Sequence, residues 1–318
     1  MQLSTSSRSF SVHDSLLPLL DAVEVMMFAS IRASAEQVSR STESASDAAA
    51  YHLKAGGQRV RTKIALQAGL DAGLDSSDAV VIAATVELLH NASLVHDDIE
   101  DGDEDRRGQP AVWCRFGVNT AICTGDLLLS ASYATLCKLN DTRALAQMIS
   151  LVHKRVSMAI DGQCADLRAG TAKLVDIATA VTHYQQIAIA KSGALLGLPL
   201  ELVLLAAGHE AYLSDAWATA QAFAIGYQIV DDLHDVQTDS SSETAKSGYN
   251  IVTVYKGAGS PEQAVENARQ LGLEKINLAI SLANSLPFKI GERLADYACA
   301  LRGALTSYKY EAQISGRN

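Results

Sequence analysis

The sequence predicts an all-α protein of about nine or ten helices. Along most of the chain, apolar residues recur three and four positions apart, which is the period of an amphipathic helix. The 318 residues are 48% hydrophobic with only 5 Pro, and the helix formers Ala, Leu, Gln and Glu dominate the periodic stretches. One strand-like run, residues 251–255, is too short to define a sheet and equally suits the start of a helix.

The periodic stretches, taken in order, give the predicted helices. Clusters of Gly, Ser, Asp and Pro, which favour turns, separate them. The helical ranges are 15–35, 62–73, 77–101, 117–139, 143–168, 174–196, 210–236, 261–284 and 289–309. Residues 79–95 and 194–207 are apolar on nearly every side, so we expect them in the middle of a bundle. No long polar linker interrupts the pattern, which predicts one domain over 1–318 with a loose tail at 1–13.

Composition and charge argue against other classes of protein. A net charge of −10 without a basic run argues against non-specific nucleic-acid binding. The Ser-rich start lacks the apolar stretch of a secretory signal, and Pro199 and Glu201 interrupt the longest apolar run, so we expect no transmembrane segment. Five cysteines form no CxxC pair and stand mostly among apolar neighbours. We expect them to be small core residues in a reducing compartment, the cytoplasm.

An acidic segment, residues 97–105, directly follows the first of the two apolar helices. Asp97 and Asp101 are four residues apart and share one helical face, where like charges repel unless a cation binds there. Oxygen ligands without cysteine favour Mg²⁺. An arbitrary acidic run is most often a solvated turn, but here Arg106 and Arg107 follow at once. Carboxylates beside two adjacent arginines indicate a site that binds both metal ions and phosphate groups.

The same spacing returns near residue 231. Asp231 and Asp235 end the apolar helical stretch 218–230, and two such boxes predict a metal site at one mouth of a helical bundle. We expect His234 at the surface or behind the ligands, because Mg²⁺ prefers oxygen. The Gly-Gly-Gln-Arg segment at 56–61 can bind phosphate through backbone amides and arginines, although such a loop is usually just a helix junction.

Taken together, these motifs resemble the trans-isoprenyl diphosphate synthase family, the polyprenyl synthetases. The matching segments in order are GGQRVR, ELLHNASLVHDDIED, RRG, GD, DGQCADL, KSG and GYQIVDDLHD. They extend over about residues 50–255, and the two Asp boxes with RRG and GYQIVDD in this order are highly specific. The resemblance implies an isoprenoid-synthase-type helical bundle around a central cavity. It also implies a homodimer and a geranylgeranyl- or farnesyl-type transferase of prenyl groups.

The resemblance assigns roles to individual residues. Three Mg²⁺ ions per active site would be held by Asp97, Asp101, Asp231 and Asp235. The residues expected to be catalytic are Asp97, Asp98, Asp101, Arg106, Lys191, Asp231 and Asp232. An allylic diphosphate would contact Arg106, Lys191, Ser192, Gln228 and Lys246. Isopentenyl diphosphate would contact Gln58, Arg61, His90 and Arg107, with Gln163 and Asp166 lining the reaction cavity.

The implied chemistry follows from charge. Metal ions and guanidinium groups would stabilise the departing diphosphate, and apolar helical walls would keep water from the allylic cation. The double bond of isopentenyl diphosphate would then attack, and a proton would be lost to the departing diphosphate.

Product length should depend on the helix before the first box. In the family, an aromatic residue at the positions of Ala92 and Ser93 stops the chain at fifteen carbons, and here both residues are small. Leu89 and Val86 lie deeper and would form a partial floor. The resemblance therefore implies a C20 product, geranylgeranyl diphosphate, or a longer one.

Departures from the family pattern leave two alternatives open. Gln58 stands where the family has Lys, Thr62 replaces a Pro, and the Gly-Lys-rich segment after the second box is shortened to 245–250. Because Gln58 should weaken the isopentenyl diphosphate site, one alternative is a terpene cyclase-like enzyme that ionises a prenyl diphosphate without condensation. The other is a non-catalytic regulatory subunit, against which the two intact Asp boxes argue.

Overall fold

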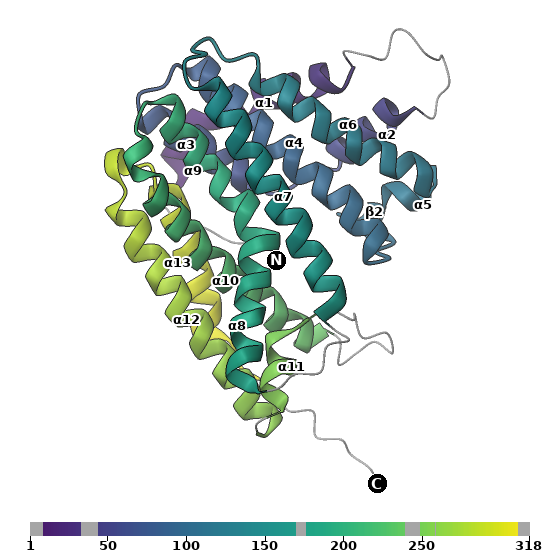
Figure 1. Ribbon diagram of the computed structural model, residues 1–318, viewed down its shortest axis with the longest axis vertical. Coiled ribbons are helices and arrows are strands. Elements are labelled where there is room, and N and C mark those ends of the chain that lie inside the picture. Colours follow the sequence, from purple (N-terminus) through teal and green to yellow (C-terminus); the bar gives the residue numbers. More distant parts are fainter. Residues whose placement is uncertain (1–8, 33–43, 170–175, 239–248, 258, 311–318) are drawn as a thin grey trace.

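The computed structural model describes residues 9–32, 44–169, 176–238, 249–257 and 259–310, and these confirm the all-α prediction (Figure 1). The α-helices are α1 (Ser9–Arg32), α2 (Ala45–Lys54), α3 (Val60–Asp71), α4 (Ser76–Glu100), α5 (Val112–Phe116), α6 (Val118–Leu136), α7 (Leu145–Ala169), α8 (Ile177–Ala188), α9 (Ala194–Ala206), α10 (Leu213–Thr238), α11 (Ile251–Lys256), α12 (Pro261–Ser285) and α13 (Glu292–Ser307). Short elements are the π-helical turn η1 (Ile189–Gly193), the 3₁₀ turns η2 (Glu210–Tyr212) and η4 (Pro287–Lys289), and the strands β1 (Asp105–Arg106) and β2 (Gln109–Pro110).

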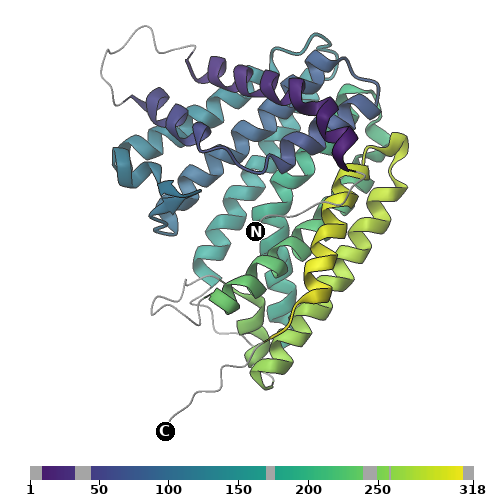
Figure 2. The same cartoon turned by 180° about the vertical axis from the view of Figure 1, so that it is seen from behind.

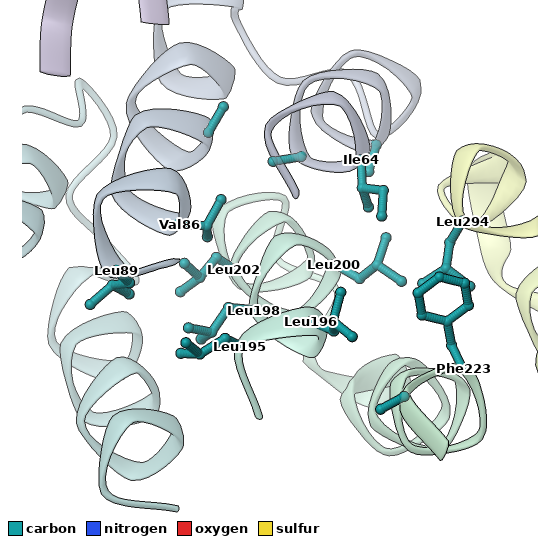
Figure 3. Packing of buried hydrophobic residues seen from close by; sticks show 14 of the residues in the cluster. Ile64, Val86, Leu89, Leu195, Leu196, Leu198, Leu200, Leu202, Phe223 and Leu294 are labelled. Carbon is teal, nitrogen blue, oxygen red and sulfur yellow. The ribbon is translucent and has the colours of Figure 1, made fainter. Parts of the chain in front are cut away.

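Helix α9 lies at the centre of the bundle, as its apolar sequence predicts. Every residue from 194 to 205 is buried, and α9 packs against α3, α4, α7 and α10. Its leucines point in two directions, some toward Val86 and Leu89 of α4 and others toward Phe223 of α10 (Figure 3). A helix without a polar face needs such a position, because any exposed side would leave leucines in water.

The other helices pack in layers around this centre. On one side α4 contacts α1, α3 and α6, and on the other α10 packs against α12, which α13 accompanies (Figure 2). Helices α10 and α12 approach closely at Gly226, where an added Cβ would lie 2.5 Å from the side chain of Ile276. Together these contacts fix the C-terminal ends of α4 and α10, which carry the two Asp boxes.

The structure also contains elements that the periodicity did not indicate. Helix α2 is too short to show a long apolar pattern, but its Ser44 and Asp47 form a capping box that marks its start. Residues 251–255, the strand-like run, begin the short helix α11. Helix α1 begins at Ser9, so part of the segment expected to be a loose tail is helical.

The prediction that the cysteines are small core residues is wrong. All five are free thiols and all are exposed: Cys114, Cys123, Cys137, Cys164 and Cys299. Some of their apolar sequence neighbours are buried, such as Leu136 beside Cys137 and Ala298 beside Cys299, while Ile122 beside Cys123 is itself exposed. Adjacent residues in a helix are about 100° apart, so an apolar neighbour does not predict burial.

Two helical stretches are long and apolar enough to cross a membrane. They are Ser76–Glu100, which is α4, and Ile177–Ala206, which runs from α8 through α9. In each, 78% of the most apolar window is buried against other parts of the protein. Core helices of a bundle have the same composition, because they too are surrounded by apolar side chains.

Candidate active site

Both Asp boxes border one cavity of about 540 Å³ at the C-terminal ends of α4 and α10. The loop before α3, the Arg106-Arg107 turn and the π-helical turn η1 complete its wall. The predicted site residues on this wall are Gln58, Arg61, His90, Ser93, Asp97, Arg106, Arg107, Lys191, Ser192, Gln228 and Asp231. Site residues predicted from motifs that are far apart in the sequence therefore line one cavity.

The remaining predicted residues lie around this cavity or outside the described part. Asp98 and Asp232 are buried behind the wall, and Asp101 and Asp235 are exposed one turn beyond Asp97 and Asp231 on the chain. Asp166 and Gln163 come from α7, and both amide atoms of Gln163 are buried without a hydrogen-bond partner among the described residues. The chain-length candidates Ala92 and Leu89 are buried within α4. Lys246 lies outside the described residues.

Asp97 and Asp231 share an unusual electrostatic environment. Burial raises the pKa of Asp97 to about 7, with Asp101 adding to the rise and Lys191 opposing it. Burial likewise raises the pKa of Asp231 to about 7, and the neighbouring carboxylates Asp232 and Asp235 act in the same direction. Each side chain would be stabilised as an anion by a cation bound in front of it.

The donors around the cavity suit Mg²⁺. Carboxylate oxygens from two helices face one space, and cysteine is absent from the wall. In the described part of the chain, no three His, Cys, Asp or Glu side chains converge into a ready-made metal cage. Mg²⁺ commonly binds through one or two carboxylates together with waters and substrate phosphates, so this open arrangement fits it.

The second aspartate of each box binds protein groups instead of facing the cavity. Asp98 is fully buried and accepts a hydrogen bond of 2.7 Å from Nε of Arg106, whose guanidinium also contacts Asp103. Asp232 accepts 2.8 Å from the backbone N–H of Ile251, and Nε2 of Gln228 donates to it at 3.1 Å. Asp98 thus fixes Arg106 on the cavity wall, and Asp232 joins α10 to the start of α11.

Lys191 enters the cavity from the π-helical turn η1. Its Nζ lies 2.7 Å from Oδ2 of Asp166 on α7. Burial works against the charged ammonium, but Asp166 and Asp97 together raise the pKa of Lys191, so it stays a cation. The two elements approach closely at Gly162, where an added Cβ would lie 2.7 Å from the carbonyl carbon of Ala190. Lys191 is therefore held in an ion pair with Asp166 while it borders the cavity.

A second group of cations lines the side of the cavity near α3. The Nε atom of Arg61 is buried without a hydrogen-bond partner among the described residues. Burial, together with Arg61 and Arg107, lowers the pKa of His90 well below its ordinary value, so His90 is neutral. Arg107 donates to the carbonyl of Gly56, and its guanidinium carbon would lie 2.8 Å from a Cβ on Gly57. A φ of +136° favours glycine at this position, whereas the guanidinium end of Arg107 could shift to make room for a Cβ.

Two polar wall residues, Glu87 and Tyr227, were not singled out from the sequence, and a third, Arg59, was expected only as one of the phosphate-binding arginines of segment 56–61. Arg59 lies within the GGQRVR motif but pairs with Glu87 at 2.8 Å. Glu87 was detectable as the one acidic residue in the mostly apolar stretch 79–95. Tyr227 precedes Asp231 by one helical turn, and the spacing alone places its phenol on the same face.

Comparisons with known proteins agree with this arrangement. A family model described as polyprenyl synthetase matches residues 42–252. Over 205 residues, 64% of this chain and 62% of the relative, the chain is 30% identical to a short chain isoprenyl diphosphate synthase of Methanothermobacter thermautotrophicus. Over 196 residues it is 34% identical to a geranylgeranyl pyrophosphate synthase of Geoglobus acetivorans, covering 59% of each chain. The matching segments thus span about three fifths of these relatives' length.

The fold is also that of solved structures. A geranylgeranyl pyrophosphate synthetase structure from Pyrococcus horikoshii superposes with a TM-score of 0.75 at 22% identity, over 93% of this chain and 99% of that one. The matched family segment contains both Asp boxes, the Gly-Gly loop and the Arg106-Arg107 turn. From the matched segment and the shared fold, this chain belongs to the polyprenyl synthetase family.

Proposed function

We propose that this protein is a Mg²⁺-dependent, chain-elongating prenyltransferase that condenses an allylic diphosphate with isopentenyl diphosphate. The observation that carries the proposal is one cavity bordered by two Asp boxes and by four cationic side chains besides Arg59. Lys191 and Arg106 lie beside the first box, and Arg61 and Arg107 lie toward α3. These four cations around one cavity provide enough positive charge for two diphosphates. Relatives named as geranylgeranyl and short chain isoprenyl diphosphate synthases support this substrate class.

In the proposed reaction, the first step is ionisation of the allylic diphosphate. Asp97 and Asp231, with Asp101 and Asp235 at the mouth, would hold Mg²⁺, which supplies positive charge to the departing diphosphate. Lys191, Arg106 and Gln228 would bind the same diphosphate. Positioning these donors before the reaction stabilises charge as it develops, without the cost of reorienting water.

The second step is attack by the double bond of isopentenyl diphosphate. Arg61 and Arg107 would hold its diphosphate, and the neutral His90 can donate one hydrogen bond without adding charge. Leu94 and Leu195 on the cavity wall exclude water from the cation. The proton released after bond formation passes to the departing diphosphate.

The proposed product is C20 or longer. Ser93 on the cavity wall is small and leaves space for a growing tail beside Leu94. Below it, Ala92, Leu89 and Val86 are buried in the packed helix α4 and would form the floor.

We also propose that the protein forms a homodimer and is located in the cytoplasm. A homodimer is supported by exposed apolar side chains on α6 and α7, where Val118 is 44%, Ile122 45% and Ile160 56% exposed. A cytoplasmic location is supported by the five exposed free thiols, which persist in reducing compartments.

The experiment is an assay of the purified protein with Mg²⁺, isopentenyl diphosphate and each allylic diphosphate from C5 to C20. We expect elongated products, with C20 as the main one. Diphosphate release from an allylic substrate alone would instead support a cyclase-like enzyme, which Gln58 on the cavity wall would favour. No reaction with any starter would support a regulatory subunit.

A further inference from the structure

Glu87 is a carboxylate on the wall of a cavity that is proposed to bind anions. Among the described residues on this wall, it is the one acidic side chain outside the Asp boxes. Its side chain is only 2% exposed. A buried negative charge beside a diphosphate site is unfavourable for both folding and binding, unless it is paired and serves another purpose.

The pairing of Glu87 is complete. Nη1 of Arg59 donates to its Oε1 at 2.8 Å, and the hydroxyl of Thr62 donates to its Oε2 at 2.7 Å. Burial alone would raise the pKa of Glu87, but Arg59 and Thr62 lower it, so the carboxylate is ionised. Charge-assisted hydrogen bonds of this kind are the strongest in proteins.

Both partners belong to the start of helix α3. Arg59 is its N-cap residue and has a φ of +53°, a left-handed conformation that is uncommon for residues other than glycine. The side chain of Arg59 makes no capping hydrogen bond at this helix end, and Thr62 is the third residue of α3. Glu87, on the neighbouring helix α4, therefore stabilises this helix end in place of a cap, because its negative charge lies beside the positive end of the α3 dipole.

Arg61 lies between the two residues that Glu87 holds. The carboxylate of Glu87 thus holds the side chain of Arg59, two residues before Arg61, and the side chain of Thr62, the residue after it. A second layer supports Glu87 from behind. Asn91 donates to the backbone carbonyl of Glu87 at 2.7 Å, and His52 and Asn91 are joined at 3.1 Å.

We propose that Glu87 is a positioning residue for the second diphosphate site. By holding Arg59 and Thr62, it fixes the first turn of α3 so that Arg61 points into the cavity. The proposal rests on the proposed function and names the part of the fold that orients its isopentenyl diphosphate site.

The test compares three variants of the full-length protein. Glu87→Gln keeps the shape and removes the charge that holds Arg59. We expect the KM for isopentenyl diphosphate to rise about 10-fold, which is the usual order for a lost charge-assisted hydrogen bond, with kcat and the KM of the allylic diphosphate little changed. Arg59→Gln should give a similar rise. The double variant should cost less than the sum of the two single ones, because both break the Arg59–Glu87 pair, while Arg59→Gln alone also removes the contact with Glu24.

The matched control is Glu201→Gln. Glu201 is a buried carboxylate that pairs with Arg155 outside the cavity, so its loss should lower stability without changing either KM. If Glu87→Gln does not fold, Thr62→Val keeps the charge, removes one hydrogen bond, and should raise the same KM by a smaller factor.

Direct titration with isopentenyl diphosphate separates this proposal from the proposed function. An absence of elongation by the unmodified protein would contradict the proposed function. Unchanged or tighter binding of isopentenyl diphosphate by Glu87→Gln would overturn the positioning role, as would an equal loss in Glu201→Gln.

Discussion

At the scale of single residues, the two adjacent aspartates that begin each box have different surroundings. Asp97 and Asp231 border the cavity, whereas Asp98 and Asp232 are buried and bind protein groups. In a helix, neighbouring residues point about 100° apart, so a DD pair places one carboxylate forward and the other sideways. The spacing predicted that acidic groups gather here, but the partners of Asp98 and Asp232 depend on tertiary contacts.

The raised pKa values of Asp97 and Asp231 predict a pH dependence. A carboxyl group with a pKa of about 7 is increasingly protonated below that pH, and a cation binds only the deprotonated form. The affinity for Mg²⁺ with inorganic diphosphate should therefore fall about 10-fold per pH unit below 7 for each linked proton.

The measurement is titration calorimetry at pH 6, 7 and 8 in buffers of different ionisation enthalpy. It should show proton release on binding, most strongly below pH 7. The stability of the ligand-free protein depends on pH in the opposite direction. Because the folded state holds protons on Asp97 and Asp231 more tightly than the unfolded chain does, these groups stabilise the folded state at low pH, and this stabilisation is lost as the pH rises through about 7. An affinity independent of pH would contradict this assignment.

Gln58 gives a second prediction at this scale. It lies on the cavity wall near Arg61 and Arg107, where a cation would add attraction for a diphosphate. Gln58→Lys should lower the KM for isopentenyl diphosphate by roughly 3- to 10-fold, as expected for one added charge contact. Gln147→Lys, at an exposed position of α7, adds the same charge away from the cavity and should leave KM unchanged. A KM that rises in Gln58→Lys would refute this role for the loop.

At the scale of elements, the sequence was most informative about long helices. The two apolar stretches could be placed at the centre because a helix without a polar face has few other stable positions. The π-helical turn η1 could not be predicted, since one widened turn barely disturbs the apolar period. The two-residue ladder of β1 and β2 is likewise too short for any alternation to appear.

The contact between α7 and η1 leads to a prediction. Gly162→Ala would place a Cβ 2.7 Å from the carbonyl carbon of Ala190 and push η1 away from α7. We expect a loss of about 1–3 kcal/mol in the free energy of unfolding, together with lower kcat, because the ion pair of Lys191 with Asp166 depends on this approach.

A matched control exists on another helix. Gly303 lies in α13 with no atom within 4 Å of an added Cβ. Gly303→Ala should therefore stabilise the protein by about 0.5–1 kcal/mol and leave kcat unchanged. Denaturant unfolding and steady-state kinetics measure both effects, and a Gly162→Ala protein with normal kcat would show that the contact does not matter.

At the scale of the whole molecule, the acidic residues behind the net negative charge are concentrated in two segments. Residues 97–105 carry seven acidic side chains and residues 231–239 carry four, which together exceed the net charge of −10. The sequence could predict two metal boxes and a family resemblance. It could not show that α4 and α10, whose boxes begin 134 residues apart, border one cavity, because that depends on how the whole bundle packs.

The shape of the cavity predicts how product length responds to mutation. Ser93 lies on its wall, so Ser93→Tyr should fill the tail space and shift products to shorter chains, while Ser93→Ala should not. Ala92→Tyr should also shorten the product. Because Ala92 is only 4% exposed, we expect this variant to lose stability as well. Chromatography of the dephosphorylated products measures the shift, and an unchanged product from Ser93→Tyr would place the tail elsewhere.

The most direct test of the central claim counts condensation and diphosphate release in one reaction. Purified protein with Mg²⁺ and an allylic diphosphate is assayed with and without labelled isopentenyl diphosphate. If one cavity binds both substrates, each diphosphate released should accompany one labelled isopentenyl unit incorporated, and little diphosphate should be released without isopentenyl diphosphate. Equal release of diphosphate in both reactions, with no label in a longer product, would contradict the proposed condensation.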